Sequence, residues 1–163
     1  MAIQFFDVHE PPYGDLSNFS KHPFTLDKVW YPTAEHAFQA AKFVGSPQAE
    51  AIRRQRGAKD AARMARDCRS LVRGDWDEVK DVTLRRVLLA KFSAHPDLRA
   101  LLVGTGDEPI EFASPIDAYW GVGRDGAGQN RFGRLLEELR RTLRTFKATF
   151  DPLPPGSSEP PGA

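Results

Sequence analysis

The most regular pattern in this chain is a helical repeat near its C-terminal end. Apolar side chains recur there at steps of three or four, at Phe132, Leu135, Leu136, Leu139, Leu143 and Phe146. A similar repeat directs side chains toward a core before Pro96 interrupts it, at Trp76, Val79, Val82, Val87 and Phe92. Both repeats predict amphipathic helices. The earlier one begins at Asp75, where Glu78 completes a variant of the capping box.

Two further helices are predicted upstream of these. Thr33 can cap a helix over residues 33–43, because Pro32 precedes it and a Gly-Ser-Pro sequence follows its end. The next helix is expected over residues 47–69. Its side chains include seven basic and three acidic groups, so its face is strongly cationic. A short helical turn is expected at residues 97–103.

Short strands are predicted at residues 3–6 and 109–113, and residues 24–31 favour a hairpin that turns at Asp27-Lys28. Long helices joined to a few short strands indicate an α+β fold, predominantly helical, rather than a doubly wound parallel sheet. We therefore expect a single compact domain over residues 1–150, with a few short antiparallel strands. Residues 151–163 include five prolines, and such a segment is predicted to form a disordered tail.

Composition narrows the class of protein. The 163 residues suit one domain. The 23 Lys and Arg residues nearly balance the 22 Asp and Glu residues, so the chain has no strong overall electrostatic field that would attract nucleic acid or a membrane. A single cysteine, Cys68, excludes an intramolecular disulfide and a zinc site built on clustered thiolates. No apolar run is long enough to span a membrane, and the first residues do not resemble a signal peptide. These features predict a cytoplasmic protein without a membrane partner.

The predicted helix 33–43 holds the first candidate chemistry. Glu35, Gln39 and Lys42 stand at i, i+4 and i+7, so an acid, an amide and an amine share one stripe. Seven residues separate Glu35 from Lys42 by roughly 10 Å along the axis, a distance that suits two groups flanking a sugar. The alternative is that the helix dipole alone favours an acid in the first turn and a lysine in the last. His36 lies beside this stripe and is expected in the core rather than on a metal.

A second candidate site lies in a glycine-rich segment, residues 114–133. It matches neither common nucleotide-binding signature, but its glycines let backbone N–H groups approach an anion: Gly121, Gly123, Gly126, Gly128 and Gly133. Asn130 can cap the helix that follows, Asp117 and Asp125 add carboxylates, and Trp120 offers a flat ring to a base. The alternative is a flexible surface loop. Upstream, the loop 11–24 combines aromatic residues with Ser17 and Asn18.

Taken together, five segments resemble the NADAR or YbiA-like domains, in the same order and over nearly the whole predicted domain. They are YGDLSNF at 13–19 with PF at 23–24, WYPTAEHAFQAAKF at 30–43, RGDW at 73–76 with Lys80, KFSAHPDLRALLVGTG at 91–106, and IEFASPIDAYWGVGRDGAGQNRFGRLLEELR at 110–140. Family members include enzymes that cleave N-glycosidic bonds. Some act on phosphoribosylamino-pyrimidine intermediates of riboflavin synthesis, and others remove ADP-ribose from guanine in DNA.

The resemblance implies an N-glycosidase that needs no cofactor and no metal. Glu35 would stabilise positive charge on the anomeric carbon, or a neutral Lys42 would attack that carbon and open the sugar as a Schiff base. The residues expected to bind substrate are Asn18, Phe19, Gln39, Asp117, Trp120, Gly121, Gly123, Asp125 and Asn130. The partner would be a small ribosylated or ADP-ribosyl molecule, or ADP-ribosylated DNA. The alternative is a sensor that binds ADP-ribose or a related nucleotide without catalysis.

Overall fold

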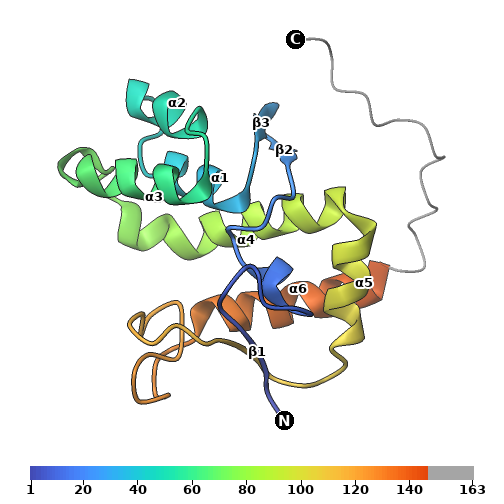
Figure 1. Ribbon diagram of the computed structural model, residues 1–163. Helices are drawn as coiled ribbons and strands as arrows, with labels where there is room; N and C mark the ends of the chain where they lie inside the picture. The colour runs from blue at the N-terminus through green and yellow to red at the C-terminus, as the bar shows by residue number, and fades with distance from the viewer. Residues whose placement is uncertain (147–163) are drawn as a thin grey trace.

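A long central helix, α4 (Trp76–Ala94), crosses the middle of the molecule, and the other elements pack on its two sides (Figure 1). The computed structural model describes residues 1–146. One side holds α1 (Ala34–Ala41), α2 (Pro47–Arg53), α3 (Ala58–Asp67) and a hairpin of β2 (Phe24–Leu26) and β3 (Val29–Tyr31). The other holds α5 (Pro96–Gly104), α6 (Arg131–Phe146), β1 (Ile3–Phe5) and β4 (Ile110–Phe112). Short 3-10 turns, η1 (Gly14–Leu16) and η2 (Arg69–Leu71), complete the described elements.

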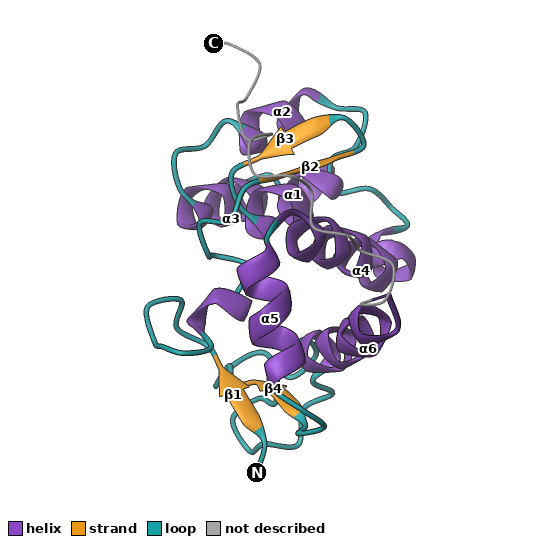
Figure 2. Cartoon of the chain, turned by 90° about the vertical axis from the view of Figure 1, so that its right-hand side faces the viewer, coloured by secondary structure: helices purple, strands orange, loops and turns teal. Residues whose placement is uncertain are grey.

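Three groups of buried apolar side chains hold these elements together. The largest joins α4, α5 and α6 to the β1–β4 pair, through residues such as Phe92, Leu136 and Ile110. A second lies between α1, α2 and α3 around Phe43 and Ile52, and a third fixes the hairpin to α1 and α4. The predominantly helical α+β fold is therefore confirmed, since each strand contains only three residues, and Figure 2 shows these short strands among the helices.

The two clearest helices are confirmed, with small corrections. The predicted apolar stripe of α6 is buried at Phe132, Leu135, Leu136 and Leu139, whereas Phe146 is exposed at the last turn. On α4, Val82 is 52% exposed, because the buried face follows Leu84, Val87, Leu88 and Phe92 and position 82 falls on the opposite side. Asp75 makes no side-chain capping bond to α4. Its carboxylate instead binds the guanidinium of Arg73.

The single helix expected over residues 47–69 is wrong. The chain forms two helices, and Gly57 stands before α3 in an extended conformation. The break is favourable because it lets Ile52 of α2 and Ala61 and Ala65 of α3 reach the same buried cluster beside α1. A continuous helix would extend away from that cluster.

The strands form two separate pairs. The hairpin is antiparallel as expected, and Asp27 and Lys28 both have positive φ, as a tight two-residue turn requires. The pair β1 and β4 is parallel, with Ile3 opposite Ile110, so the expectation of antiparallel strands is wrong for it. Most of the chain separates these two strands, and its helices return the chain to the same end of the pair.

The glycine-rich loop after β4 is folded rather than loosely extended. Its backbone closes on itself through two hydrogen bonds of 2.7 Å, from the Gly128 amide to the Val122 carbonyl and from the Gln129 amide to the Ala118 carbonyl. A Cβ on Gly128 would lie 2.4 Å from the carbonyl oxygen of Gly121, so only glycine allows this crossing.

Two expectations about the chain as a whole are only partly covered by the structure. No helix within residues 1–146 is both long and apolar enough to cross a membrane. The expected domain end near residue 150 and the predicted tail at 151–163 lie outside the described residues.

Candidate functional site

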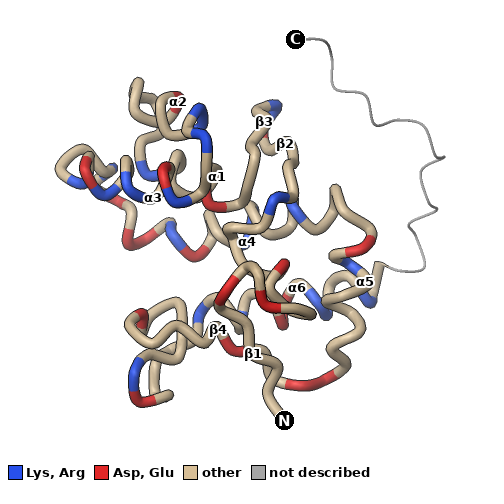
Figure 3. Tube along the Cα trace, viewed as in Figure 1, with Lys and Arg blue, Asp and Glu red and all other residues tan. Residues whose placement is uncertain are grey.

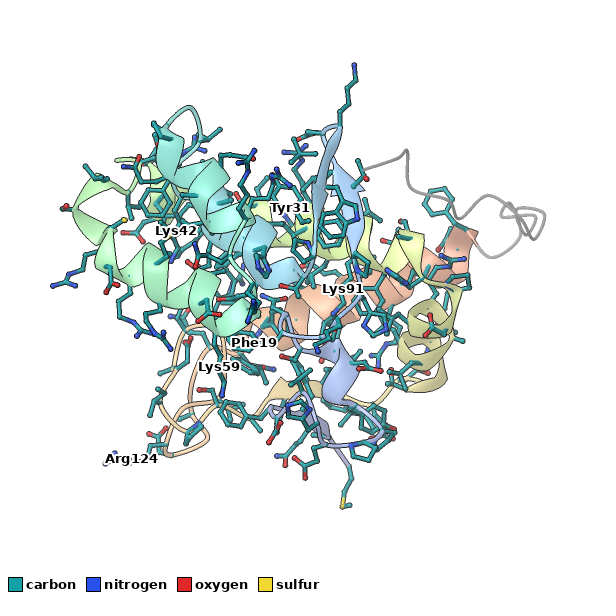
Figure 4. The ribbon with its side chains drawn as sticks, turned by 45° about the horizontal axis from the view of Figure 1, so that its top comes forward. Phe19, Tyr31, Lys42, Lys59, Lys91 and Arg124 are labelled. Atoms are coloured by element: carbon teal, nitrogen blue, oxygen red, sulfur yellow. The ribbon has the colours of Figure 1, made fainter. Side chains whose placement is uncertain are left out.

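A cavity of about 700 Å³ opens where α1, the loops around residues 6–9 and 17–19, and the glycine-rich loop meet. It is lined by Phe6, Asp7, Val8, His9, Ser17, Asn18, Phe19, Glu35, Phe38, Gln39, Lys42, Lys59, Leu84, Phe112, Asp117, Trp120 and Phe132. Figure 4 labels Phe19, Lys42 and Lys59 of this wall, together with Arg124 in the glycine-rich loop. The wall therefore combines aromatic rings with one buried acid and two amines.

The predicted stripe of α1 faces this cavity along its length. Thr33 caps the helix, accepting a hydrogen bond from the His36 amide, and Glu35, Gln39 and Lys42 all line the wall. His36 is fully buried and binds Thr33 and the Gln55 carbonyl through its ring nitrogens, which agrees with a role in the core. The helical spacing thus places acid, amide and amine together as the sequence predicts.

Glu35 is the acid of the site and is only 8% exposed. Burial raises the pKa of its carboxyl group, because the charged form loses its contact with water. The Gln39 amide, which donates to Glu35 Oε1 at 2.7 Å, opposes this rise, as do the positive charge of Lys42 and the Asn18 amide. A carboxyl group in this setting can exchange a proton nearer to neutral pH than an exposed one.

Lys42 supplies the amine at the C-terminal end of α1. Its Nζ lies 5.9 Å from the ring centre of Phe38 and 5.6 Å from that of Trp76. Burial lowers the pKa of this amine, the charge of Glu35 opposes the change, and Arg66 and Lys80 reinforce it. The neutral form, which is nucleophilic, is therefore more accessible than for a lysine in water.

Asn18 and Phe19 bring the 17–19 loop to the wall. The backbone carbonyl of Asn18 accepts a hydrogen bond of 2.9 Å from the Glu35 amide, which ties the loop to the first turn of α1. Within residues 1–146, Asn18 Oδ1 and Gln39 Oε1 are buried without a hydrogen-bond partner. Two amides beside Glu35 thus retain unused acceptor capacity.

Trp120 and Asp117 are the residues of the glycine-rich loop that reach the cavity. The Trp120 ring meets Phe38 edge-on, with centroids 5.6 Å apart. Asp117 Oδ1 accepts hydrogen bonds from the backbone amides of Tyr119 and Trp120, at 3.0 and 2.8 Å. Asp117 therefore fixes the turn that presents the Trp120 ring.

Four predicted binding residues, Gly121, Gly123, Asp125 and Asn130, are not among those that line the cavity. Asn130 was expected to cap α6, but its amide donates to the Ile110 carbonyl and accepts from the Phe112 amide, both in β4. Asp125 binds the amide of Ala127 in its own turn, and Gly121 packs under the Phe112 carbonyl. Their contacts are those of residues that shape the loop.

The structure adds residues that sequence reasoning missed. Lys59, in the first turn of α3, lines the cavity, and the cationic character of residues 47–69 was its only signal. Phe6, Phe112 and Phe132 enter from three separate segments and carried no signal beyond their apolarity. Among the residues that the structure describes, no three His, Cys, Asp or Glu side chains are grouped to hold a metal ion.

Comparison with known proteins supplies the family. The model of the NADAR domain matches residues 4–144. N-glycosidase YbiA of Escherichia coli is 44% identical over 145 residues, covering 89% of this chain and 90% of that protein. The solution structure of E. coli YbiA superposes with a TM-score of 0.83 at 42% identity, covering 93% of this chain and 89% of that one.

A plant relative extends this comparison. The maize riboflavin biosynthesis protein PYRR, chloroplastic, is 39% identical over 146 residues, which cover 80% of this chain and 23% of that longer protein. Matches of this extent, supported by an equivalent fold, show that the chain is an N-glycosidase belonging to the NADAR domain family.

Proposed function

We propose that this N-glycosidase hydrolyses the bond between ribose and a heterocyclic nitrogen inside the cavity that contains Glu35 and Lys42. The observation that carries the proposal is the placement of a buried acid and a half-buried amine on one helical stripe. The rings of Phe38 and Trp120 lie in the same wall and offer flat surfaces to a base. A cavity of about 700 Å³ has room for a sugar and a heterocycle together.

The substrate we propose is a phosphorylated ribosylamino-pyrimidine of the kind formed in riboflavin synthesis. The name of the maize relative supports this class, and Lys59 at the cavity wall gives a cation for the phosphate. A second candidate is ADP-ribose linked to guanine in DNA. The cations of α3 favour it, because Lys59 lines the cavity and Arg66 acts on Lys42 there, so together they offer contacts to further phosphates.

Two chemical routes fit these residues. In the first, ionised Glu35 stabilises the oxocarbenium-like state while water attacks the anomeric carbon. In the second, neutral Lys42 attacks that carbon, and the C–N bond breaks with its electron pair leaving on the base. The base takes up a proton from Glu35. The Lys42 nitrogen then gives a proton to the ring oxygen as the ring C–O bond breaks, which leaves an open-chain iminium ion. Water adds to the carbon of this iminium ion, the bond to Lys42 breaks to release the sugar aldehyde and the free amine, and the proton that is set free returns to Glu35. Both routes need Glu35, and only the second forms an adduct.

Product analysis tests the proposal. The protein is incubated with the phosphorylated ribosylamino-pyrimidine and, separately, with an oligonucleotide that carries ADP-ribosyl guanine. Release of a free base and ribose phosphate from the first supports the pyrimidine substrate, and restored guanine in the second supports the DNA substrate. If neither product forms while both ligands bind, the cavity only binds these nucleotides and the proposal is wrong.

A further inference from the structure

One buried lysine lies just outside the cavity and has no part in the two routes above. Lys91 of α4 is fully buried, with a relative exposure of 0%. None of the salt bridges found among residues 1–146 includes it. A charged group without an ionic partner is costly to bury, so its hydrogen bonds must provide the compensation.

Those hydrogen bonds go to a single turn of backbone. Lys91 Nζ donates to the carbonyl oxygens of Asp15 and Ser17, each at 2.9 Å. The Asp15 carbonyl lies within η1, and the Ser17 carbonyl follows its end, where it also accepts a hydrogen bond of 3.2 Å from the Ser20 amide. The amine thus holds this turn from inside the protein, and Figure 4 shows Lys91 to the right of Lys42 and Lys59.

The turn continues directly into the cavity wall. Ser17 and Asn18 have successive carbonyls: the first accepts from Lys91, and the second accepts from the Glu35 amide at 2.9 Å. The side chain of Asn18 lies beside the Glu35 carboxyl group and opposes the rise of its pKa. Two hydrogen bonds, joined by the backbone from Ser17 to Asn18, therefore connect Lys91 to the acid of the site.

We propose that Lys91 is a positioning residue, which fixes the Gly14–Asn18 turn so that Asn18 stays in contact with Glu35. The assignment of Glu35 as the acid rests on the proposed function, whereas the connection itself rests on the contacts. Lys91 is not among the residues that line the cavity, so it has no direct contact with substrate there. Asp15 and His22 are the charged or titratable groups that face it from the loop side.

Hydrogen exchange at two neighbouring amides tests this connection without substrate. The first-turn amides of a helix have no partner inside the helix, so their protection depends on outside acceptors. The Glu35 amide depends on the Asn18 carbonyl, and the His36 amide depends on the Thr33 side chain. In Lys91→Met, which keeps the length but loses the donors, we expect Glu35 to exchange at least tenfold faster and His36 to be unchanged.

Lys21→Met is the matched control, because Lys21 is exposed in the same loop and has no role in the site. This variant should exchange both amides, Glu35 and His36, at the same rates as the wild type. Lys91→Gln, which keeps two N–H donors on a shorter side chain, should give an intermediate rate at Glu35 and serves as the test if Lys91→Met does not fold. Unchanged exchange at Glu35, or equal acceleration at Glu35 and His36, would overturn the proposal.

Turnover of the ribosylamino-pyrimidine phosphate gives the second measurement. Release of the turn should lower kcat tenfold or more and change KM by less than threefold, because Asn18 would leave Glu35 while the rest of the wall remains. A change in KM alone contradicts the positioning role. A wild-type protein that releases no base refutes the proposed function, and the exchange comparison still decides whether Lys91 fixes the turn.

Discussion

Glu35 is the side chain on which both chemical routes depend. Glu35→Gln keeps nearly the same volume and can still pair with Gln39, but it neither carries the charge nor donates the proton. We expect kcat to fall by about a hundredfold or more, with an unchanged circular dichroism spectrum and an equal or higher melting temperature, since a buried charge is removed. Activity close to the wild type in steady-state assays would contradict the role of Glu35.

Lys42 separates the two routes. If its amine attacks the anomeric carbon, borohydride added during turnover should reduce the imine, and peptide mass mapping should place a sugar adduct on Lys42. Lys42→Arg should abolish both adduct and activity, because a guanidinium stays protonated at working pH.

Substrate consumption without any adduct would leave Lys42 an electrostatic role and assign the chemistry to Glu35 with water. An adduct on Lys80 or Lys91 would show that another lysine is the nucleophile. Lys59→Arg, at the same cavity wall, is the matched control and should still form the Lys42 adduct.

Lys91 should also give the folded state a distinct pH dependence. Burial lowers the pKa of its amine to about 7, from an ordinary value of 10.5. Between these two values the unfolded chain binds a proton that the folded protein has released, so the free energy of unfolding rises with pH, by about 1.4 kcal/mol per pH unit at most. Below pH 7 both states are protonated, and the contribution is constant.

Lys91→Met removes this titration. The free energy of unfolding of the wild type, minus that of the variant, should therefore increase as the pH rises from 7 toward 10, which urea denaturation at several pH values measures. If the free energies of unfolding of the two proteins change with pH in parallel across this range, the buried amine does not titrate there.

At the level of helices and strands, the spacing of apolar residues predicted those features that depend only on residues close together in the sequence. The helices α6 and α1 could be predicted because one face of each is buried, which gives their apolar residues a helical spacing. The stripe from Glu35 to Lys42 follows from helical geometry alone. The break at Gly57 and the parallel pairing of β1 with β4 could not be predicted in this way. Both result from contacts between segments distant in sequence, around Ile52 in one case and Ile110 in the other.

The position of Asn130 shows the same limit within the candidate site. A residue just before a helix commonly caps it, but Asn130 has a positive φ and both of its amide groups bind β4. Nothing in the local sequence indicates that β4 lies within reach. Similarly, Lys59 and Phe6 reach the cavity only because α3 and β1 fold toward it, so tertiary structure completes a wall that α1 begins.

Asn130 gives a prediction that separates loop shape from binding. Asn130→Ala removes both hydrogen bonds to β4 and leaves a non-glycine residue at positive φ, so the free energy of unfolding should fall by about 2 kcal/mol or more. Asp125→Ala is the control, because it removes one exposed bond in the same loop and should change stability by about 0.5 kcal/mol or less. Equal stability of the two variants in urea titrations would contradict a fixing role for Asn130.

The distribution of charge over the whole molecule bears on which substrate enters. The formal net charge is only +1, yet residues 47–69 hold four more basic than acidic side chains, seven against three. Figure 3 shows these blue segments along α2 and α3. Some are neutralised locally, since Glu50 pairs with Arg53 and Arg54. Lys59 and Arg66 remain close to the cavity, the first in its wall and the second near enough to lower the pKa of Lys42.

A salt titration distinguishes the two substrates on this basis. A DNA strand that crosses α3 would release counterions from several phosphates, so its dissociation constant should rise by about tenfold or more between about 50 and 200 mM salt. A free nucleotide with one phosphate contact should weaken by only about threefold over the same range. Because Lys59 lies in the wall and Arg69 lies outside it, Lys59→Gln should weaken both ligands, whereas Arg69→Gln should weaken only the DNA. Equal salt dependence for both ligands would mean that the arginines of α2 and α3 make no contact with nucleic acid, and that the cavity alone selects the substrate.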